Sequence, residues 1–294
     1  MRLICTSIFI LCSYFLFGQE TVPNQFWNNF SHFNPAFAGL QYKRQAGLQY
    51  EGFRSGNSQN DYQAFYNQRL KKNFGIGFNG NHMTSWNDQT TEISIPISYD
   101  WNVKGKHHVA VGVAPSFRNH ITVGYVLDTT QAGTIYITNT DVPFRRNYLQ
   151  THAGITYKRG NLYAGFGIRN LQIQSAGDAE LGEWEPHYYG NISVEMPIGN
   201  RTQYNVRHKL ILSGLYTYVD GFNRIDVNAR AQWENGLNVF VGGRVRGGWT
   251  TGAGWDFFQK LRFLYSVSWQ RSKLSSSNSV SHEISVVYHL PFED

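Results

Sequence analysis

The strongest constraint on the fold is an alternation of apolar and polar residues that recurs from about residue 42 onward. In its clearest run one face is entirely apolar: Ile225, Val227, Ala229, Ala231 and Trp233. The opposite face is polar: Arg224, Asp226, Asn228, Arg230 and Gln232. Successive side chains of a β-strand point to opposite faces, so such a run predicts a strand with one apolar and one polar wall.

Composition narrows the class of protein to two β folds. The 294 residues are 16% aromatic and only 16% charged, against roughly 25% charged in an ordinary soluble domain. This excludes a disordered tail and a coiled coil. Mean hydropathy is −0.41, and beyond the first 18 residues no apolar run approaches the ~18 residues of a membrane-spanning helix. A soluble β protein and a membrane β-barrel remain.

Residues 1–18 have the plan of a secretory signal peptide. Arg2 precedes an apolar stretch, and we expect cleavage before Gln19. Both cysteines, Cys5 and Cys12, lie within this segment, which would leave the exported chain without a thiolate metal site or a thiol nucleophile. The net charge of +6 is mild and does not suggest a nucleic-acid partner.

The alternation predicts a closed barrel. It repeats in fourteen segments, which begin near these residues: Tyr42, Tyr62, Phe74, Thr91, His107, Tyr148, Leu162, His187, Val206, Arg224, Leu237, Thr250, Leu261 and Ser281. An even number suits an antiparallel barrel with both termini in the periplasm, and strands of about ten residues cross a bilayer when tilted. We therefore expect an all-β outer-membrane barrel of about 14 strands.

The predicted connections alternate in length. The short ones are 71–73, 159–161, 234–236 and 259–260, and the long ones are 119–147, 172–186 and 272–280. Short periplasmic turns and long extracellular loops are typical of outer-membrane barrels. A soluble β protein is the alternative, because Pro96 and Pro115 fall inside predicted strands and each removes a ladder hydrogen bond. We interpret both prolines as bulges or strand ends.

No motif indicates an enzyme or a cofactor. Gly75, Gly77 and Gly80 match a dinucleotide loop in spacing, but no helical pattern follows, so we interpret them as small residues that face a crowded lumen. Four histidines could supply a base: His152, His187, His282 and His289. The chain has no GxSxG and no HExxH, so we assign no catalytic residue, metal or cofactor. A barrel-embedded lipid hydrolase is the enzymatic alternative.

Charges are predicted on the inner wall and on both rims. The inward set has both signs, which predicts a salt-bridged lumen: Asp100, Arg118, Arg169, Glu195, Arg230, Arg244, Asp256, Arg262 and Glu283. The short turns are basic: Lys71, Lys72, Lys104, Lys106, Lys158, Arg159, Arg201, Arg207 and Lys260. The long loops are mostly acidic, for example Asp178 and Glu180. The basic rim is either an ordinary solvated surface or a docking site for an acidic periplasmic partner.

The segment before the first strand belongs to no wall, because its aromatic residues do not alternate. We divide the chain into a signal peptide (1–18), a periplasmic or plug segment (19–40) and a barrel (41–294). The segment must be buried in the lumen or against a partner. The expected partner-binding residues are Phe26, Trp27, Phe30, Phe33, Asn34, Pro35, Phe37, Gly39, Lys71, Lys72, Lys104 and Lys106.

This segment also carries a family resemblance. Its end, Asn34-Pro35-Ala36-Phe37-Ala38-Gly39, shortly after the predicted cleavage point and ahead of the strands, resembles the start of the PorP/SprF family of Bacteroidota. The last strand, 281–288, resembles that family's closing strand, although the chain continues past Leu290 where such barrels commonly end on an aromatic residue. The resemblance implies an outer-membrane barrel linked to type IX secretion and gliding motility.

The expected function is therefore protein binding. The resemblance implies partners among the outer-membrane and periplasmic proteins of the secretion machine, and in some members a secreted surface adhesin, with the lipid and lipopolysaccharide bilayer around the wall. It supplies no catalytic residues. The alternative is a passive outer-membrane channel or solute transporter, which the sequence does not separate from a binding component.

Overall fold

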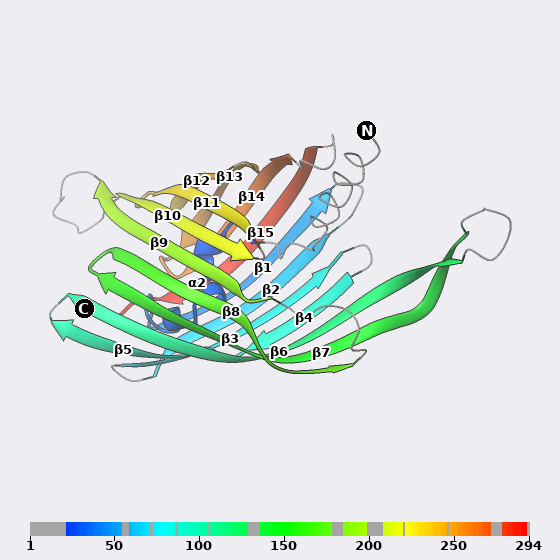
Figure 1. Cartoon of the computed structure of the whole chain (residues 1–294). Helices are drawn as coiled ribbons and strands as arrows, with labels where there is room; N and C mark the ends of the chain where they lie inside the picture. The colour runs from blue at the N-terminus through cyan, green and yellow to red at the C-terminus, as the bar shows by residue number, and fades with distance from the viewer. Residues whose placement is uncertain are drawn as a thin grey trace, which may run out of the picture.

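The computed structural model describes residues 22–54, 59–70, 73–85, 88–104, 106–128, 136–177, 185–198, 208–219, 221–245, 247–271 and 278–292. They form one antiparallel sheet that closes on itself (Figure 1). None of the helices in these ranges is long and apolar enough to cross a membrane.

The described residues form fifteen strands. They are β1 (Arg44–Arg54), β2 (Asn60–Arg69), β3 (Phe74–Thr84), β4 (Asp88–Ser94), β5 (Ile97–Lys104), β6 (His107–Asp128), β7 (Tyr136–Arg159), β8 (Leu162–Gly177), β9 (His187–Ile198), β10 (His208–Val219), β11 (Phe222–Gln232), β12 (Leu237–Arg244), β13 (Gly248–Phe257), β14 (Leu261–Arg271) and β15 (Asn278–Leu290). Apart from β4 and β5, which do not pair with each other, each strand pairs with its sequence neighbours, and β15 pairs with β1 to close the ring.

Strands β4 and β5 are two parts of one wall element. Both pair with β3 on one side and with β6 on the other, and only Ile95 and Pro96 separate them. Counting them together gives a closed barrel of fourteen antiparallel strands, which confirms the predicted fold. Pro96 lies at a strand end, as expected, but Pro115 lies inside β6, opposite Thr151 of β7. Its carbonyl accepts the Ile95 N–H at 3.1 Å, so both prolines interrupt the ladder at the same place.

Burial follows the predicted alternation. Along β11, Ile225 and Val227 are exposed on the outer wall, whereas Asp226 and Arg230 are buried on the inner wall. A barrel wall with apolar side chains outside and polar side chains inside suits a protein that is surrounded by lipid and has packed polar groups in its lumen. Of the predicted inward charges, seven are buried: Asp100, Arg118, Arg169, Arg230, Asp256, Arg262 and Glu283.

The connections differ from the predicted ones at several points. The short-turn rim carries the turns 160–161, 233–236 and 258–260, but also the end of β9 and the start of β10, where Ile198 pairs with His208. At the opposite long-loop rim, β10 and β11 remain paired as far as Val219 and Phe222. The stretch 119–147, predicted as a loop, is mostly β6 and β7, which pair with each other as far as Asp128 and Tyr136. A stretch rich in Thr and Val forms a strand as readily as a loop, so the polarity of this stretch alone led to the wrong prediction of a loop.

Residues 22–40, called here the luminal segment, lie inside the barrel (Figure 1). They contain three short helices: η1 (Phe26–Asn28), α2 (Phe30–Phe33) and η2 (Pro35–Phe37). The segment runs from one rim to the other. Val22 accepts a bond from Arg224, near the long-loop end of β11, whereas Gly39 accepts one from Arg69 at the short-turn end of β2. β1 begins and β15 ends at the short-turn rim, whereas the luminal segment begins, at Val22, near the long-loop rim.

Candidate functional site

The lumen is the candidate site, because the luminal segment contacts the wall on all sides. Its apolar side chains form one cluster with the inner wall, which includes Phe26, Phe30, Phe37 and Phe240. Trp27 meets Phe240 of β12 edge to face with ring centroids 5.0 Å apart, and Phe33 meets Tyr189 of β9 at 5.3 Å. Pairs of this geometry contribute about 0.5–1.5 kcal/mol beyond the area they bury.

The C-terminal half of the luminal segment, residues 33–40, packs against glycines of the wall. A Cβ on Gly75 would overlap the Ala38 carbonyl, one on Gly112 the backbone of Pro35 and Ala36, and one on Gly167 the Phe33 carbonyl. These glycines lie on β3, β6 and β8. Only a residue without a side chain lets two backbones approach this closely.

The Gly75, Gly77 and Gly80 spacing thus has a structural explanation. Gly75 and Gly77 are buried on the inner wall, as predicted, and a Cβ on Gly77 would meet Asn67 and Pro96. The prediction was wrong for Gly80, which lies on the outer face of β3 beside Phe78. Three glycines at this spacing cannot all face one side of a strand, because the last interval is odd.

Asn34 fixes the same half of the segment through its side chain. Its Oδ1 accepts the Ala36 N–H at 3.0 Å and so caps η2. Its Nδ2 donates to the Ile155 carbonyl at 3.1 Å and to Thr156 Oγ1 at 3.0 Å. Pro35 follows at the first helical position, where its missing N–H costs nothing. One fully buried side chain therefore both shapes the segment and ties it to β7.

The N-terminal half, residues 24–29, is held by polar side chains. The Gln25 N–H donates to both carboxylate oxygens of Glu283, at 3.1 and 3.2 Å. The Gln25 side chain donates to Ser266 at 3.1 Å and accepts from Ser285 at 2.6 Å. Asn24 donates to Glu51 at 2.6 Å. Glu51 and Glu283 face each other across β1 and β15, so these donors satisfy two neighbouring buried carboxyl groups.

The charges of the inner wall form ion pairs, as the sequence predicted. Glu92 pairs with Arg118 and with Arg169 at 2.7 Å, and its Oε1 lies at hydrogen-bond distance, 2.9 Å, from His152 Nε2. Arg169 also contacts His32 of the luminal segment at 2.9 Å. Asp256 pairs with Arg262 at 2.7 Å. Glu195 and Arg244 are only partly buried, near the rims, where Glu195 pairs with Lys209 at 2.6 Å.

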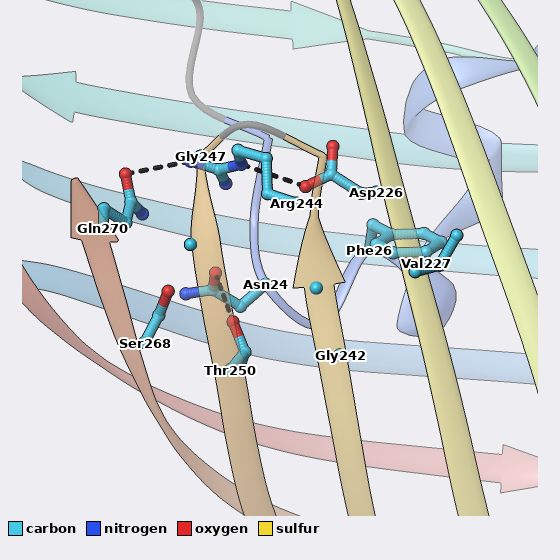
Figure 2. Close-up of a pocket in the computed structure, with 12 residues that line it drawn as sticks. Asn24, Phe26, Asp226, Val227, Gly242, Arg244, Gly247, Thr250, Ser268 and Gln270 are labelled. Atoms are coloured by element: carbon cyan, nitrogen blue, oxygen red, sulfur yellow. Dashed lines mark hydrogen bonds and ion pairs between the residues drawn. The ribbon is translucent and has the colours of Figure 1, made fainter. Parts of the chain in front are cut away.

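A narrow pocket lies at the long-loop end, beside the N-terminal half of the luminal segment. Figure 2 shows Arg244 between Asp226 and Gln270, with Nε 3.1 Å from Asp226 and Nη1 2.9 Å from Gln270. Asn24 faces Thr250 at 3.2 Å across the pocket. Asn24 and Phe26 of the luminal segment therefore border this pocket.

The short-turn mouth is covered by the end of the segment and by the chain's last residues. Lys158 donates to the Leu40 carbonyl at 3.5 Å. The Phe292 ring lies 5.8 Å from the Arg69 guanidinium and 5.9 Å from the Lys158 ammonium. Phe292, two residues beyond the end of β15, thus lies against the mouth.

The expected partner-binding residues occupy two separate places. Eight lie in the lumen and all are buried: Phe26, Trp27, Phe30, Phe33, Asn34, Pro35, Phe37 and Gly39. Lys106 is exposed at the short-turn rim, next to the end of β5 at Lys104. Lys71 and Lys72 lie outside the described residues. Partner binding by either group stays a prediction.

Sequence reasoning missed the glycines that receive the luminal segment on the later strands. Gly112, Gly154, Gly165 and Gly167 occupy inner-wall positions, and a Cβ on any of them would collide with residues 33–36. The available signal was glycine at positions where the alternation predicts an inward polar side chain, which marks a close backbone approach.

Comparisons with known proteins agree with this architecture. The family model described as "Type IX secretion system membrane protein PorP/SprF" matches residues 16–288. Among solved structures, the Ralstonia pickettii toluene transporter TbuX is 11% identical with a TM-score of 0.57, over 88% of this chain and 92% of that one. The CymD monoaromatic hydrocarbon channel is 11% identical with a TM-score of 0.54, over 91% and 94%. None of the curated proteins compared matches the sequence. At this identity the two structures show a shared outer-membrane barrel fold alone.

Proposed function

Because the chain belongs to the PorP/SprF family of type IX secretion system membrane proteins, we propose that it is a non-enzymatic, protein-binding component of a type IX secretion complex. It binds an exported surface protein at the long-loop rim and periplasmic or membrane proteins of the machine at the short-turn rim. The signal peptide is removed after residue 18, and the short-turn rim faces the periplasm.

The observation that carries this proposal is the occupied lumen. The luminal segment contacts β15 through Glu283, β12 through Phe240, β6 through Gly112 and β8 through Gly167. A solute on its way through would have to displace a buried segment that is packed against glycines. This favours a binding component over the alternative, a passive channel or solute transporter, which would need an open path.

The short-turn rim is the proposed contact surface for periplasmic partners. Lys106 and Arg159 are exposed there, and Lys260 extends from the β13–β14 turn. Exposed cations of one sign select and steer an acidic partner. Direct contact by Phe26–Gly39 requires the luminal segment to leave the lumen, so we assign the first contact to the rim.

Mild detergent extraction of the tagged protein from its native membranes tests the proposal. The wild-type barrel is expected to retain defined partners, and charge reversal at Lys71, Lys72, Lys104 and Lys106 together is expected to release the periplasmic ones. The matched control reverses the acidic loop residues Asp178 and Glu180. Heat-modifiable mobility in gels verifies that every variant is a folded barrel. Recovery of a wild-type barrel without any partner would contradict the proposal.

A further inference from the structure

The turn between β13 and β14 has an unusual backbone. Phe258 has φ 52° and Gln259 has φ 55°, which places two consecutive residues in the left-handed region. Turns whose two central residues both have positive φ favour Asn-Gly or Gly-Gly, because a side chain at positive φ crowds the following carbonyl. For a bulky residue such as Phe this conformation is strained.

A neighbouring turn on the same rim uses residues that avoid this strain. Asn235-Gly236 joins β11 to β12, and Gly236 has φ 93°. The Asp256 N–H donates to the Gly236 carbonyl at 2.8 Å, so the two turns lie next to each other. Elsewhere among the described residues, the positions with positive φ are glycines, apart from Asn170. The strain at Phe258 is therefore particular to this turn.

The Phe258 side chain gains no packing in exchange for the strain. It is 91% exposed, whereas Phe257 and Leu261, the last wall pair of the same hairpin, are 47% and 42% exposed. The lipid-facing positions of the hairpin are thus already occupied by partly covered apolar side chains. A fully exposed aromatic ring on a strained backbone suits an anchor that is buried only when a partner binds.

Positive charge lies beside this turn. Lys260 and Arg44 are exposed. The Lys260 carbonyl accepts the His289 N–H at 2.8 Å, and the next residue, Leu290, lies opposite Arg44 in the β1–β15 register. Glu234, in the adjacent turn, is the acidic residue on the other side. The surroundings of Phe258 are therefore predominantly basic.

We propose that Phe258 is the anchor residue by which the short-turn rim holds a protein partner whose docking surface has an apolar pocket bordered by carboxylates. Phe258 fills the pocket, and Lys260 and Arg44 face the carboxylates. This deepens the proposed function and rests on it, because it assumes that a protein binds at this rim.

One double substitution is expected to raise stability and to weaken binding, because it removes both the backbone strain and the proposed anchor. Replacing Phe258 by Asn together with Gln259 by Gly installs the residues of the neighbouring turn. The midpoint of thermal unfolding in detergent is expected to rise by a few degrees, while affinity for the partner falls about tenfold or more, as expected for an interface anchor. Phe258→Trp keeps a large ring and is expected to retain binding.

Photo-crosslinking in cells identifies the partner. Benzoylphenylalanine at position 258 is expected to give one protein adduct, and the same label at Leu261 on the lipid-facing wall is expected to give none. The crosslinked protein is then identified by mass spectrometry, purified and titrated against wild type and the double variant. Equal affinity for both barrels overturns the anchor, and so does an adduct that proves to be a second copy of this chain.

A further experiment, in lipid vesicles, distinguishes contact of Phe258 with a protein from contact with the membrane. A single cysteine at position 258 or 261 carries a polarity-sensitive dye in vesicles of phosphatidylethanolamine and phosphatidylglycerol. Emission at 258 is expected to report water, and emission at 261 to report lipid. Matching lipid-like emission at both positions overturns the inference. If the rim lysines but not Phe258 prove necessary for binding, the anchor fails and the proposed function stands, whereas a partner-free barrel defeats the proposed function itself.

Discussion

The two halves of the luminal segment are held by different kinds of contact. Residues 33–40 lie directly on the backbone of the wall, where glycines such as Gly75 and Gly112 leave no room for a side chain. Residues 24–29 are held by hydrogen bonds to side chains of the wall, such as those of Gln25 to Glu283 and Ser266. Water can replace a polar bond but cannot replace a close-packed backbone contact. The N-terminal half is therefore the end that we expect to loosen first.

The largest expected effect comes from adding a side chain at the glycine-packed end. Gly75→Val places new atoms where the Ala38 carbonyl lies. Overpacking of this kind costs typically 1–3 kcal/mol, and more where backbone must move, so we expect residues 33–40 to be displaced. Hydrogen exchange of peptides from the segment measures the loss of protection. Gly80→Val on the outer face of the same strand is the matched control and should leave protection unchanged.

A smaller effect is expected at Asn34. Asn34→Ala removes the cap of η2 and leaves Thr156 and the Ile155 carbonyl without this donor. Losing a cap and a buried bond costs about 1–3 kcal/mol, which urea unfolding in detergent can measure. Asn34→Asp retains the capping oxygen but places a buried carboxylate oxygen against the Ile155 carbonyl, so it should be no more stable than Asn34→Ala. Equal stability of all three proteins would show that the side chain does not hold the segment.

A substitution in the N-terminal half of the luminal segment should lower stability less than the Asn34 substitution does. Gln25→Ala removes the bonds to Ser266 and Ser285, but the bonds from the Gln25 backbone N–H to Glu283 remain. We expect a cost of about 1 kcal/mol. Exchange should accelerate over residues 24–29 and stay slow over residues 33–40. Uniform acceleration along the whole segment would mean that the two halves are released together.

The smallest effect on stability is expected at the rim. Lys106→Glu changes an exposed residue, and such substitutions usually alter stability by less than about 0.5 kcal/mol. Partner recovery should nevertheless fall, since the rim and the lumen have separate roles. A rim variant that binds normally while Gly75→Val loses the partner would instead place the contact on the luminal segment.

The sequence predicted those features that depend on local alternation. The faces of Val227 and Arg230 and the closed barrel follow from a period of two. The extent of β6 and β7 did not, because Thr-rich and Asn-rich stretches fit loops and strands equally well. The Glu92 cluster joins β4, β6, β7 and β8 and is visible only after folding. A short connection was predicted at 259–260, but Phe258-Gln259 contains neither Gly nor Asn, so its positive φ values could not be predicted.

The central claim is that the barrel is a protein-binding component with a closed lumen. Ion conductance of the purified wild-type protein in planar bilayers tests it most directly, with Gly75→Val as the opened reference. We predict no steady current through the wild type and measurable current through Gly75→Val. A steady open-pore current through the wild-type barrel would contradict the account and favour a channel.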